Sequence, residues 1–334
     1  MSVRDLIIVG AGPSGLSAAI AAKRRGLDYQ VLEQGTLVNS IYRFPPQMIF
    51  FTTPELLEVG GLPFVSPYEK PTRVEALRYY RRVVDTYDLH IAFDETVLSI
   101  QVEADTGLSV GGDDSRVFAI ETKSGSGRRI RYARMVVLAI GYFDRPNRLN
   151  VPGEDLPHVH HFYGEPHPYY RRRVAIVGGG NSAAESALDM FRAGASVTLV
   201  HRRAELKSTI KYWVRPDIEN RIKEGSIAAR FNTCLMEIRP TSVVVRTGTA
   251  VEELAADAVF LLVGYHADWD LMAAAGVVMD DRRVPAYDPA TFETNVPGLF
   301  VAGGALAGMD TGNIFIENGR FHGEQIVEVI AARL

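Results

Sequence analysis

The sequence predicts an α/β fold built from two similar domains. Near the start, a mostly apolar run at residues 5–9 is followed by the glycine-rich stretch GAGPSG and then by an alanine-rich run. The same order returns within residues 172–203. The chain of 334 residues also exceeds one ordinary domain, which holds roughly 100–200 residues. An internal repeat in a chain of this length indicates two copies of one folding unit.

The first copy opens with a strand, a helix and a second strand. Residues 5–9, Asp-Leu-Ile-Ile-Val, predict a strand buried on both faces, because apolar residues follow one another without alternation. A helix from about residue 15 to residue 25 and a strand at residues 29–33 complete a βαβ opening. Further along, RMVVLAIGYF at residues 134–143 predicts another buried strand that ends near Gly141.

The second copy follows a connection at residues 147–170 that is rich in Pro, His and Gly. Residues 172–203 again predict strand, glycine loop, helix and strand. AVFLLVGYHAD at residues 258–268 parallels the last strand of the first copy, with Gly264 in place of Gly141. The two copies therefore repeat one nucleotide-binding unit.

Two further segments complete the secondary structure. The tail predicts one more strand at residues 299–302 and a long terminal helix that begins near Asn313. RRIRYAR at residues 128–134 predicts a solvated strand edge rather than a binding patch.

Composition narrows the class of protein. Hydrophobic residues make up 47% of the chain, which is ordinary for a globular protein with a real core. A net charge of −4 argues against a nucleic-acid or anionic-membrane partner. One cysteine excludes an internal disulfide and a CxxC redox pair, and fits a reducing cytosol. The sequence contains no run of about 18 uninterrupted apolar residues, so no membrane-spanning helix is expected.

The glycine-rich stretches have the context of dinucleotide-binding loops, because a strand precedes and a helix follows each of them. Glycines allow a tight turn and let backbone N–H groups approach a pyrophosphate at the positive end of a helix. The alternative is that both stretches are structural turns. The loops are Gly10-Ala11-Gly12-Pro13-Ser14-Gly15 and Gly178-Gly179-Gly180-Asn181-Ser182-Ala183.

The residues after each second strand carry opposite charges. Glu33 ends the second strand of the first copy and suits hydrogen bonding to a ribose diol. His201, Arg202 and Arg203 stand at the matching place in the second copy. A carboxylate repels a 2′-phosphate, whereas guanidinium groups bind one through paired hydrogen bonds. The first unit is therefore expected to hold a dinucleotide without a 2′-phosphate and the second to hold NADPH, unless the arginines are a solvated surface pair.

In these features the chain resembles the thioredoxin-reductase-like flavoproteins. GAGPSG with Glu33 resembles their FAD site, GGGNSAAE followed by HRRAELK resembles their NADPH site, and TNVPGLFVAGG at residues 294–304 resembles their C-terminal flavin-binding strand. The resemblance covers essentially the whole chain. It implies a homodimer of two Rossmann-like domains per subunit, with a discontinuous FAD-binding domain at residues 1–145 plus 268–334 and an NADPH-binding domain at residues 146–267.

The resemblance also implies which residues contact the two cofactors. It places FAD at Gly10, Gly12, Pro13, Ser14, Gly15, Glu33, Gln34, Asn39, Ser40, Val97, Ala139, Gly141, Gly303, Gly304, Asn313 and Ile314. It places NADPH at Gly178, Gly180, Asn181, Ser182, Ala183, His201, Arg202, Arg203, Lys207 and Gly264. The positive end of the terminal helix is expected to point at the flavin ring.

Two longer segments are similar to the bacillithiol disulfide reductase branch of this group: STIKYWVRPDIENRIKEGSIAARFNT at residues 208–233 and NIFIENGRFHGEQI at residues 313–326. This similarity implies a cytoplasmic enzyme of redox homeostasis that passes a hydride from NADPH to FAD and on to a low-molecular-weight disulfide or another acceptor. Within the first segment, an alternative to substrate contact is the apolar face of a packed helix, formed by Tyr212, Trp213, Ile218 and Ile222.

The chain departs from these relatives at several places. It has no CxxC, and Cys234 is expected to be a buried or inert thiol in a strand. Gly303-Gly304 replaces the usual Gly-Asp, so no carboxylate is offered to the flavin ribityl chain. The bacillithiol branch is expected to carry a reactive cysteine at the position of Ser14. A serine hydroxyl does not attack a disulfide as a thiolate does, so Ser14 is interpreted as a loop residue that donates a hydrogen bond to the pyrophosphate. The chemistry is then centred on the flavin, and the alternative is that Ser14 itself is catalytic.

Three other functions remain open from the sequence alone. They are a ferredoxin or flavodoxin NADP reductase, a small flavin monooxygenase (suggested by HFYGEPHPYY), and a non-enzymatic NADPH/FAD sensor. No metal site is expected. The connection is rich in histidine but offers no cysteine and no suitably spaced carboxylate; its histidines are His158, His160, His161 and His167.

Overall fold

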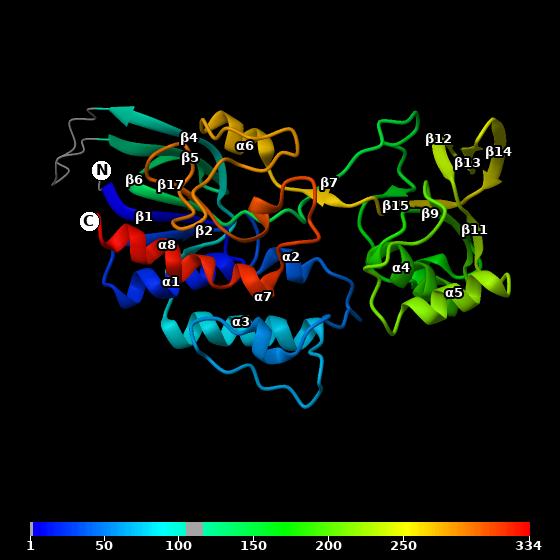
Figure 1. Ribbon diagram of the computed structural model, residues 1–334, viewed down its shortest axis with the longest axis horizontal. Coiled ribbons are helices and arrows are strands. Elements are labelled where there is room, and N and C mark those ends of the chain that lie inside the picture. Colours follow the sequence, from blue (N-terminus) through cyan, green and yellow to red (C-terminus); the bar gives the residue numbers. More distant parts are fainter. Residues whose placement is uncertain (1–2, 105–115) are drawn as a thin grey trace. The chain divides into compact units, whose positions relative to one another are not determined.

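The computed structural model describes residues 3–104 and 116–334, which form two units (Figure 1). Unit 1 contains the described residues up to Arg43, together with Gln47–Arg145 and Tyr265–Leu334. Unit 2 contains Phe44–Pro46 and Pro146–Gly264. The chain thus returns to unit 1 at residue 265, three residues before the expected boundary at residue 268. The short segment 44–46 is counted with unit 2.

Unit 1 is built on a seven-stranded sheet with the order β3-β2-β1-β6-β5-β4, and β17 pairs with β6 outside this path. β1 pairs in parallel with β2 and β6, whereas β4, β5 and the first half of β6 pair in antiparallel fashion. Leu6, Ile7 and Ile8 are fully buried, as expected for a strand covered on both faces. The strands are β1 (Val3–Val9), β2 (Tyr29–Leu32), β3 (Ile91–Ala92), β4 (Thr96–Ala104), β5 (Arg116–Ser124), β6 (Gly127–Leu138) and β17 (Leu299–Val301).

The longer helices of unit 1 lie close to one another, and α1 and α8 run side by side (Figure 1). Their contact depends on Gly323, where a Cβ would lie 2.3 Å from the backbone nitrogen of Ala18. α3 begins with a capping box formed by Thr72 and Glu75. The helical segments are α1 (Pro13–Arg24), α2 (Asn39–Tyr42), η1 (Pro54–Leu57), α3 (Arg73–Tyr87), α6 (Trp269–Ala274), η3 (Gly303–Ala307), α7 (Ile316–Gly319) and α8 (His322–Ala331).

Two expectations for unit 1 are wrong. The long terminal helix is two helices, because α7 ends at Gly319 and α8 begins at His322; Asn313 lies in the turn before both. α7 has four residues, too few to supply the dipole expected of a long helix. The segment 128–134 is not a bare edge, because it pairs with β5 and Arg129 and Arg131 bind a buried carboxylate.

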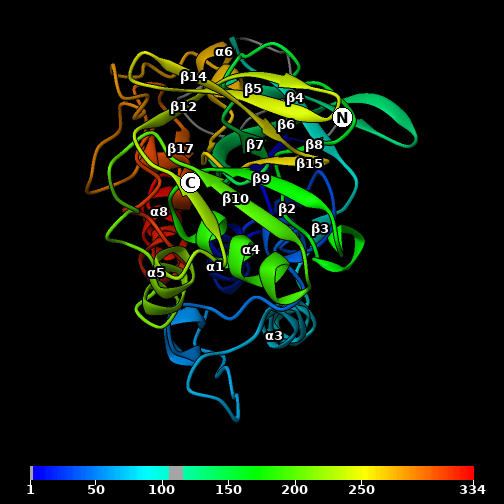
Figure 2. The same cartoon turned by 90° about the vertical axis from the view of Figure 1, so that its right-hand side faces the viewer.

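Unit 2 is built on a five-stranded parallel sheet with the order β11-β10-β9-β15-β8, and β12, β13 and β14 form a separate antiparallel sheet. α4 packs next to β10 (Figure 2). The parallel strands are β8 (Val159–His160), β9 (Arg173–Val177), β10 (Ser196–Val200), β11 (Ala228–Arg230) and β15 (Ala258–Leu261). The other elements are η2 (His167–Tyr169), α4 (Asn181–Arg192), α5 (Arg215–Lys223), β12 (Thr233–Arg239), β13 (Ser242–Thr247) and β14 (Ala250–Ala255). β7 (Arg145–Pro146) pairs with β16 (Tyr265–His266) where the chain passes between the units.

The core of unit 2 lies on both faces of its parallel sheet. Val174 and Ile176 pack into a cluster with residues of α4 and α5, while Ala175 and Val177 pack into a second cluster with residues of β12 and β13. This alternation follows from the two-residue period of a strand. The sheet therefore separates the helices from the antiparallel sheet.

Two side chains of unit 2 lie differently from the expectation. Cys234 is in β12, as expected for a strand, but it is exposed rather than buried. Tyr212 precedes α5 and is 68% exposed, so it is not part of a buried helix face. Ile218 is fully buried and Ile222 packs against the same cluster, in keeping with the packed-helix interpretation. Over the described part of the chain, no helix has the length and apolar character needed to cross a bilayer.

Candidate cofactor-binding sites

The first glycine loop is shaped by close backbone contacts. Gly10 has a φ of +104°, and a Cβ there would lie 2.4 Å from the carbonyl oxygen of Ala139. A Cβ at Gly15 would lie 2.0 Å from the carbonyl oxygen of Gly10. A Cβ at Gly12, in contrast, would meet no atom within 4 Å. The loop is thus tight on its inner side and open at Gly12, where α1 begins.

The N-terminus of α1 suits an anionic ligand. Gly12 is the N-cap residue, no side chain caps the first turn, and Pro13 occupies a first-turn position where no N–H is needed. The helix has 12 residues, so its dipole favours negative charge at this end. An open glycine next to an uncapped helix fits a pyrophosphate.

Glu33 lies directly after β2 and faces this loop. Its side chain accepts hydrogen bonds from the backbone N–H groups of Ala11 at 2.8 Å and Gly35 at 2.9 Å. Glu33 is 5% exposed, and this burial raises the pKa of its carboxyl, against the effect of the two N–H donors. Each oxygen keeps further acceptor capacity for a hydroxyl of a ribose.

Asp144 binds three polar side chains near the first glycine loop. Its carboxylate accepts hydrogen bonds from Gln34 at 2.9 Å and Asn39 at 3.3 Å, and forms an ion pair with Arg43 at 2.7 Å. Gln34 and Asn39 are predicted FAD contacts, and here both side chains bind Asp144; Ser40 is half-buried beside them. The sequence did not single out Asp144, although it directly follows the strand predicted at residues 134–143.

Ser14 points toward the tail of the chain. Its hydroxyl donates to the carbonyl oxygen of Gly319 at 2.9 Å, and a Cβ at Gly303 would lie 2.3 Å from the same hydroxyl oxygen. The hydroxyl proton is therefore committed to a backbone carbonyl rather than available to the pyrophosphate. This differs from the expected hydrogen bond, because α7 packs directly against the start of α1.

The two glycines of the tail also have close neighbours. Gly303 has a φ of +65°, and its N–H donates to Nδ1 of His322 at 3.1 Å. A Cβ at Gly304 would lie 2.7 Å from the ring of Tyr142. Tyr142 therefore occupies the space that a side chain at position 304 needs, which accounts for the missing aspartate. Burial raises the pKa of the Tyr142 phenol. Sequence reasoning missed Tyr142, although it follows the predicted Gly141.

The remaining predicted FAD residues of unit 1 lie in distinct settings. The Asn313 amide donates to Asp310 at 3.1 Å, while Ile314 is half-buried next to it. Val97 lies where the register of β4 shifts, and Ala139 is buried under Gly10. These residues offer chiefly backbone or apolar contacts.

The second glycine loop repeats the backbone arrangement of the first. A Cβ at Gly178 would lie 2.4 Å from the carbonyl oxygen of Leu262. Gly180 is the N-cap of α4, which also has 12 residues and no side-chain cap. The nearest atom to a Cβ at Gly180 would be a carbon of Lys207 at 3.7 Å. This loop therefore also fits a pyrophosphate, and Ala183 is fully buried behind it.

Asn181, a predicted NADPH contact, binds two backbone groups of unit 2. Its amide donates to the carbonyl oxygen of Thr209 at 3.0 Å, and its side-chain oxygen accepts from the backbone N–H of Lys211 at 2.8 Å. The side chain thus fastens the segment after β10 to the start of α4. Ser182 is exposed in the first turn of α4, and Gly264 lies at the end of unit 2 with a φ of +101°.

The cations after β10 are exposed and close to the loop. Arg202, Arg203 and Lys207 have no ion pair with any carboxylate of the described residues. The backbone N–H of Lys207 donates to the carbonyl oxygen of Gly179 at 2.8 Å, which ties this segment to the loop. Three unpaired cations beside a pyrophosphate-binding loop suit a second phosphate group.

His201 is not one of these cations. It is 6% exposed, and a Cβ at Gly179 would lie 2.2 Å from its ring. Burial lowers the pKa of the imidazole, so the uncharged form is favoured. Its Nε2 has no hydrogen-bond partner within the described structure. The His201 ring therefore packs against Gly179, and its contact with NADPH stays a prediction.

The histidine-rich connection has structural contacts. His158 Nε2 lies 3.1 Å from the carbonyl oxygen of Arg239, and the ring of His160 packs 4.9 Å from that of Phe260. Burial lowers the pKa of both His160 and His161. Among the residues that the structure describes, no three His, Cys, Asp or Glu side chains form a group that could hold a metal ion.

Comparison with known proteins places this geometry in a family. The Bacilliredoxin reductase Bdr of Bacillus subtilis (strain 168) is 39% identical over 329 residues, which is 98% of this chain and 97% of that protein. The solved Bacillithiol Disulfide Reductase Bdr (YpdA) from Bacillus cereus is 37% identical, with a TM-score of 0.94 and full coverage of both chains. A more distant relative, the Ferredoxin–NADP reductase of Ignicoccus hospitalis, is 26% identical over 90% of each chain. The family model described as Pyridine nucleotide-disulphide oxidoreductase matches residues 7–303. The chain therefore belongs to the pyridine nucleotide-disulphide oxidoreductase family, and it is an FAD- and NADPH-dependent oxidoreductase with the thioredoxin-reductase-like two-domain fold.

Proposed function

We propose that the chain is an NADPH-dependent FAD oxidoreductase that reduces a low-molecular-weight disulfide of the bacillithiol class. The observation that carries this proposal is the 39% identity to a bacilliredoxin reductase over nearly the full length of both chains. Two glycine loops of matching geometry, one followed by a carboxylate and one by three exposed cations, support the two cofactors.

In unit 1, the residues of the first loop hold FAD. The uncapped N–H groups of α1 bind the pyrophosphate beside Gly12, and Glu33 accepts hydrogen bonds from the adenosine ribose. When bound, FAD accepts a hydride from NADPH and passes two electrons to the disulfide, which with two protons becomes two thiols.

In unit 2, the start of α4 binds the pyrophosphate of NADPH. Arg202, Arg203 and Lys207 bind the 2′-phosphate, which distinguishes NADPH from NADH. His201 stays uncharged and keeps Gly179 in place, because its buried ring lies against that glycine.

No thiol is placed at the FAD loop, because Ser14 occupies the position of the branch cysteine and donates to Gly319. Cys234, the one cysteine of the chain, is exposed in β12 of unit 2. We therefore propose that electrons reach the acceptor without a cysteine of this chain as carrier.

Consumption of NADPH by the purified yellow protein tests the proposal. The acceptors are bacillithiol disulfide, glutathione disulfide, a quinone, a ferredoxin and oxygen, each at equal concentration. We expect bacillithiol disulfide to give the highest kcat/KM. If it supports no more NADPH oxidation than oxygen alone, the substrate assignment is wrong.

A second candidate is a ferredoxin–NADP reductase. The relative with that name in Ignicoccus hospitalis lines up with 90% of the chain, and a reductase of this kind needs no CxxC. The same panel separates the two functions, because this enzyme reduces ferredoxin rapidly and leaves every disulfide unchanged. A small flavin monooxygenase oxidises NADPH with oxygen as the acceptor, and a sensor binds both cofactors but oxidises NADPH with none of the acceptors.

We also propose that the enzyme is a cytoplasmic homodimer. Exposed large apolar side chains between α2 and α3 and at the ends of these helices support a second copy as the partner. They are Tyr42, Ile49, Phe51, Leu56, Val65, Tyr68 and Val74. Light scattering on the holoenzyme tests the dimer by its mass.

A further inference from the structure

We propose that Glu95 is a positioning residue for the FAD site: its buried carboxylate, held by Arg129 and Arg131, fixes the segment 90–95, which in turn sets the place of Glu33. This inference rests on the proposed role of Glu33 in binding the ribose of FAD. Residues 90–95, which contain β3, are called the 90–95 strap below.

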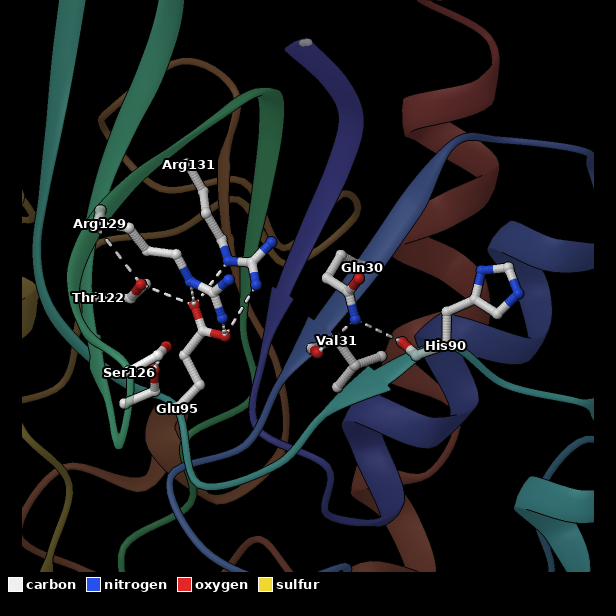
Figure 3. A network of polar contacts seen from close by, with 9 residues as sticks. Gln30, Val31, His90, Glu95, Thr122, Ser126, Arg129 and Arg131 are labelled. Carbon is white, nitrogen blue, oxygen red and sulfur yellow. Dashed lines mark hydrogen bonds and ion pairs between the residues drawn. The ribbon is translucent and has the colours of Figure 1, made fainter. Parts of the chain in front are cut away.

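The Glu95 carboxylate is one of the most completely bonded groups of unit 1. Its side chain is 1% exposed, and Figure 3 shows it between the guanidinium groups of Arg129 and Arg131. Oε1 accepts from Thr122 Oγ1 at 2.7 Å, Arg129 Nε at 3.1 Å and Arg131 Nε at 2.6 Å. Oε2 accepts from Arg131 Nη2 at 2.8 Å and from Arg129 Nη2.

This network keeps Glu95 charged although it is buried. Burial acts to raise the pKa, but the hydrogen bonds from Arg131, Thr122 and Arg129 outweigh it and lower the pKa of Glu95 to about 2. The donors come from β5 and β6, which form a long antiparallel pair. The carboxylate is thus anchored to the most extensively paired part of the sheet.

The backbone of Glu95 connects this anchor to the FAD site. Its N–H donates to the carbonyl oxygen of Glu33 at 2.9 Å. The N–H of Glu33 donates to Ala92 at 2.9 Å, and the N–H of Asp94 donates to Gly35 at 3.3 Å. The strap therefore bonds to the backbone on both sides of the Glu33 side chain.

The other end of the strap is held by Val31 and Gln30. Val31 donates its N–H to the carbonyl oxygen of His90 at 3.0 Å, and the Gln30 amide donates to the same oxygen at 3.1 Å (Figure 3). Between the two ends, β3 has only two residues, and Asp94 has a left-handed φ of +53°. A short edge strand followed by such a turn depends on an anchor, and Glu95 supplies it at the end nearer to Glu33.

A purely structural alternative predicts a different outcome. If Glu95 only joins β4 to the β5–β6 hairpin, its loss lowers the stability of unit 1 but leaves the affinity of the folded protein for FAD unchanged. If it positions Glu33, its loss weakens FAD binding in protein that is still folded. The two roles are separated by measuring FAD release well below the unfolding temperature.

The experiment measures how fast FAD leaves the holoenzyme at 25 °C, followed by the recovery of flavin fluorescence after dilution. We expect Glu95→Gln to release FAD about tenfold faster than the wild type, the usual scale for residues that orient a ligand-binding group. Arg129→Gln leaves the Arg131 pair in place and is expected to show a smaller acceleration. If Glu95→Gln fails to fold, Arg129→Gln still tests the proposal.

Glu293→Gln is the matched control. Glu293 binds both Nη groups of Arg333 and the N–H of Gly298, so its loss breaks a comparable ion pair in unit 1 without touching the strap. We expect FAD release at the wild-type rate. An equal acceleration in the control would show a general loosening of unit 1 and would overturn the positioning role. The role would also be overturned if Glu95→Gln and Arg129→Gln both released FAD at the wild-type rate.

A double-mutant cycle tests whether Glu95 acts through Glu33. We expect Glu33→Gln alone to accelerate FAD release, and Glu95→Gln to add almost nothing in the Glu33→Gln background. Additive effects would overturn the positioning role and leave the FAD assignment intact. A Glu33→Gln variant with unchanged FAD release would instead refute the proposed FAD site itself.

Discussion

In both units, the first glycine of the loop lies close to the carbonyl group of the residue that follows a neighbouring strand, β6 in unit 1 and β15 in unit 2. A Cβ would lie 2.4 Å from Ala139 at Gly10 and 2.4 Å from Leu262 at Gly178. In both units, the residue after the second strand then reaches back to the second residue of the loop. Glu33 accepts the N–H of Ala11, and the ring of His201 lies against Gly179. The backbone is repeated, whereas the charges differ: Glu33 supplies a carboxylate in unit 1, and Arg202 and Arg203, which follow His201, supply cations in unit 2.

The comparison also shows where the two loops differ. Gly15 in unit 1 corresponds to Ala183 in unit 2. A Cβ at Gly15 would lie 2.0 Å from the carbonyl oxygen of Gly10, whereas unit 2 accommodates the Cβ of the fully buried Ala183. Ser14 corresponds to Ser182. The former donates to Gly319, whereas the latter is exposed at the start of α4. These pairs allow reciprocal substitutions at the first position and the same substitution at the second to be compared between the units.

The largest effect is expected at Gly15 and Ala183. Gly15→Ala forces a Cβ against the Gly10 carbonyl and is expected to cost about 3 kcal/mol of unit 1 stability and to yield protein without FAD. Ala183→Gly creates no overlap and is expected to cost about 1 kcal/mol. The flavin absorbance of the purified variants and their unfolding midpoints measure both. A yellow Gly15→Ala protein of wild-type stability would mean that the loops tolerate the same residue.

The second-largest effect is expected on the stability of the fold at acid pH, where Glu95 in unit 1 is compared with Asp257 in unit 2. Hydrogen bonds to Arg side chains hold the pKa of each at about 2, below the ordinary values of 4.5 and 3.8. Because the folded pKa is lowered, each carboxylate stabilises the fold above its ordinary pKa, and this is lost as the pH falls toward 2. Glu95→Gln is expected to cost about 3 kcal/mol at pH 7 and progressively less below pH 4.5.

Asp257→Asn is expected to cost clearly less, because the Asp257 side chain is 32% exposed and its pair with Arg173 is screened by solvent. Urea unfolding of each variant between pH 7 and pH 3 measures the difference. An equal loss in the two units would show that burial does not decide the strength of these pairs.

A smaller effect is expected from the cations of unit 2. Arg202→Ala combined with Arg203→Ala removes two phosphate-binding groups and is expected to raise the KM for NADPH about tenfold, with little change for NADH. FAD release from unit 1 provides the control and is expected to stay the same. An unchanged KM for NADPH would refute the assignment of these arginines.

The smallest effect is expected at the paired serines. Ser14→Ala loses the hydrogen bond to Gly319 and is expected to cost about 0.5–1.5 kcal/mol, with hydride transfer from NADPH nearly intact. Ser182→Ala is expected to be neutral for stability. Ser14→Cys places a thiol at the start of α1, where its pKa is lowered, and is expected to raise bacillithiol disulfide reduction. A Ser14→Ala enzyme that loses disulfide reduction altogether would make Ser14 catalytic.

Much of the fold could be predicted because its signals are local. The apolar runs predicted β1 and β17 to within about two residues, and each glycine-rich stretch predicted a helix directly after it, where α1 and α4 lie. The tail could not be predicted as two helices, since the break follows from the packing of Gly319 against Gly303 and Ser14, far apart in sequence. Hydrophobic periodicity carries no information about such a contact.

The candidate sites show the same limit. The place after the second strand of each unit, together with its charge, led to the prediction of Glu33 and of the pair Arg202 and Arg203, and these assignments stay predictions. The partners of Ser14 and Asn181 could not be predicted, since both bind backbone carbonyl groups that only the fold brings near. Glu95 gave no sequence signal either, because its arginines lie 34 and 36 positions away.

The discontinuous build of unit 1 has a consequence for synthesis on the ribosome. Apart from residues 44–46, unit 2 is one continuous stretch, so its contacts are all available once residue 264 has emerged. Unit 1 must wait longer, because β17 adds to β6 across more than 150 residues of chain and α8 packs on α1 later still. Until then the C-terminal half of β6 has an open edge, which is prone to pair with other chains. The order of completion therefore places unit 2 first and leaves the last strand and helix to close unit 1.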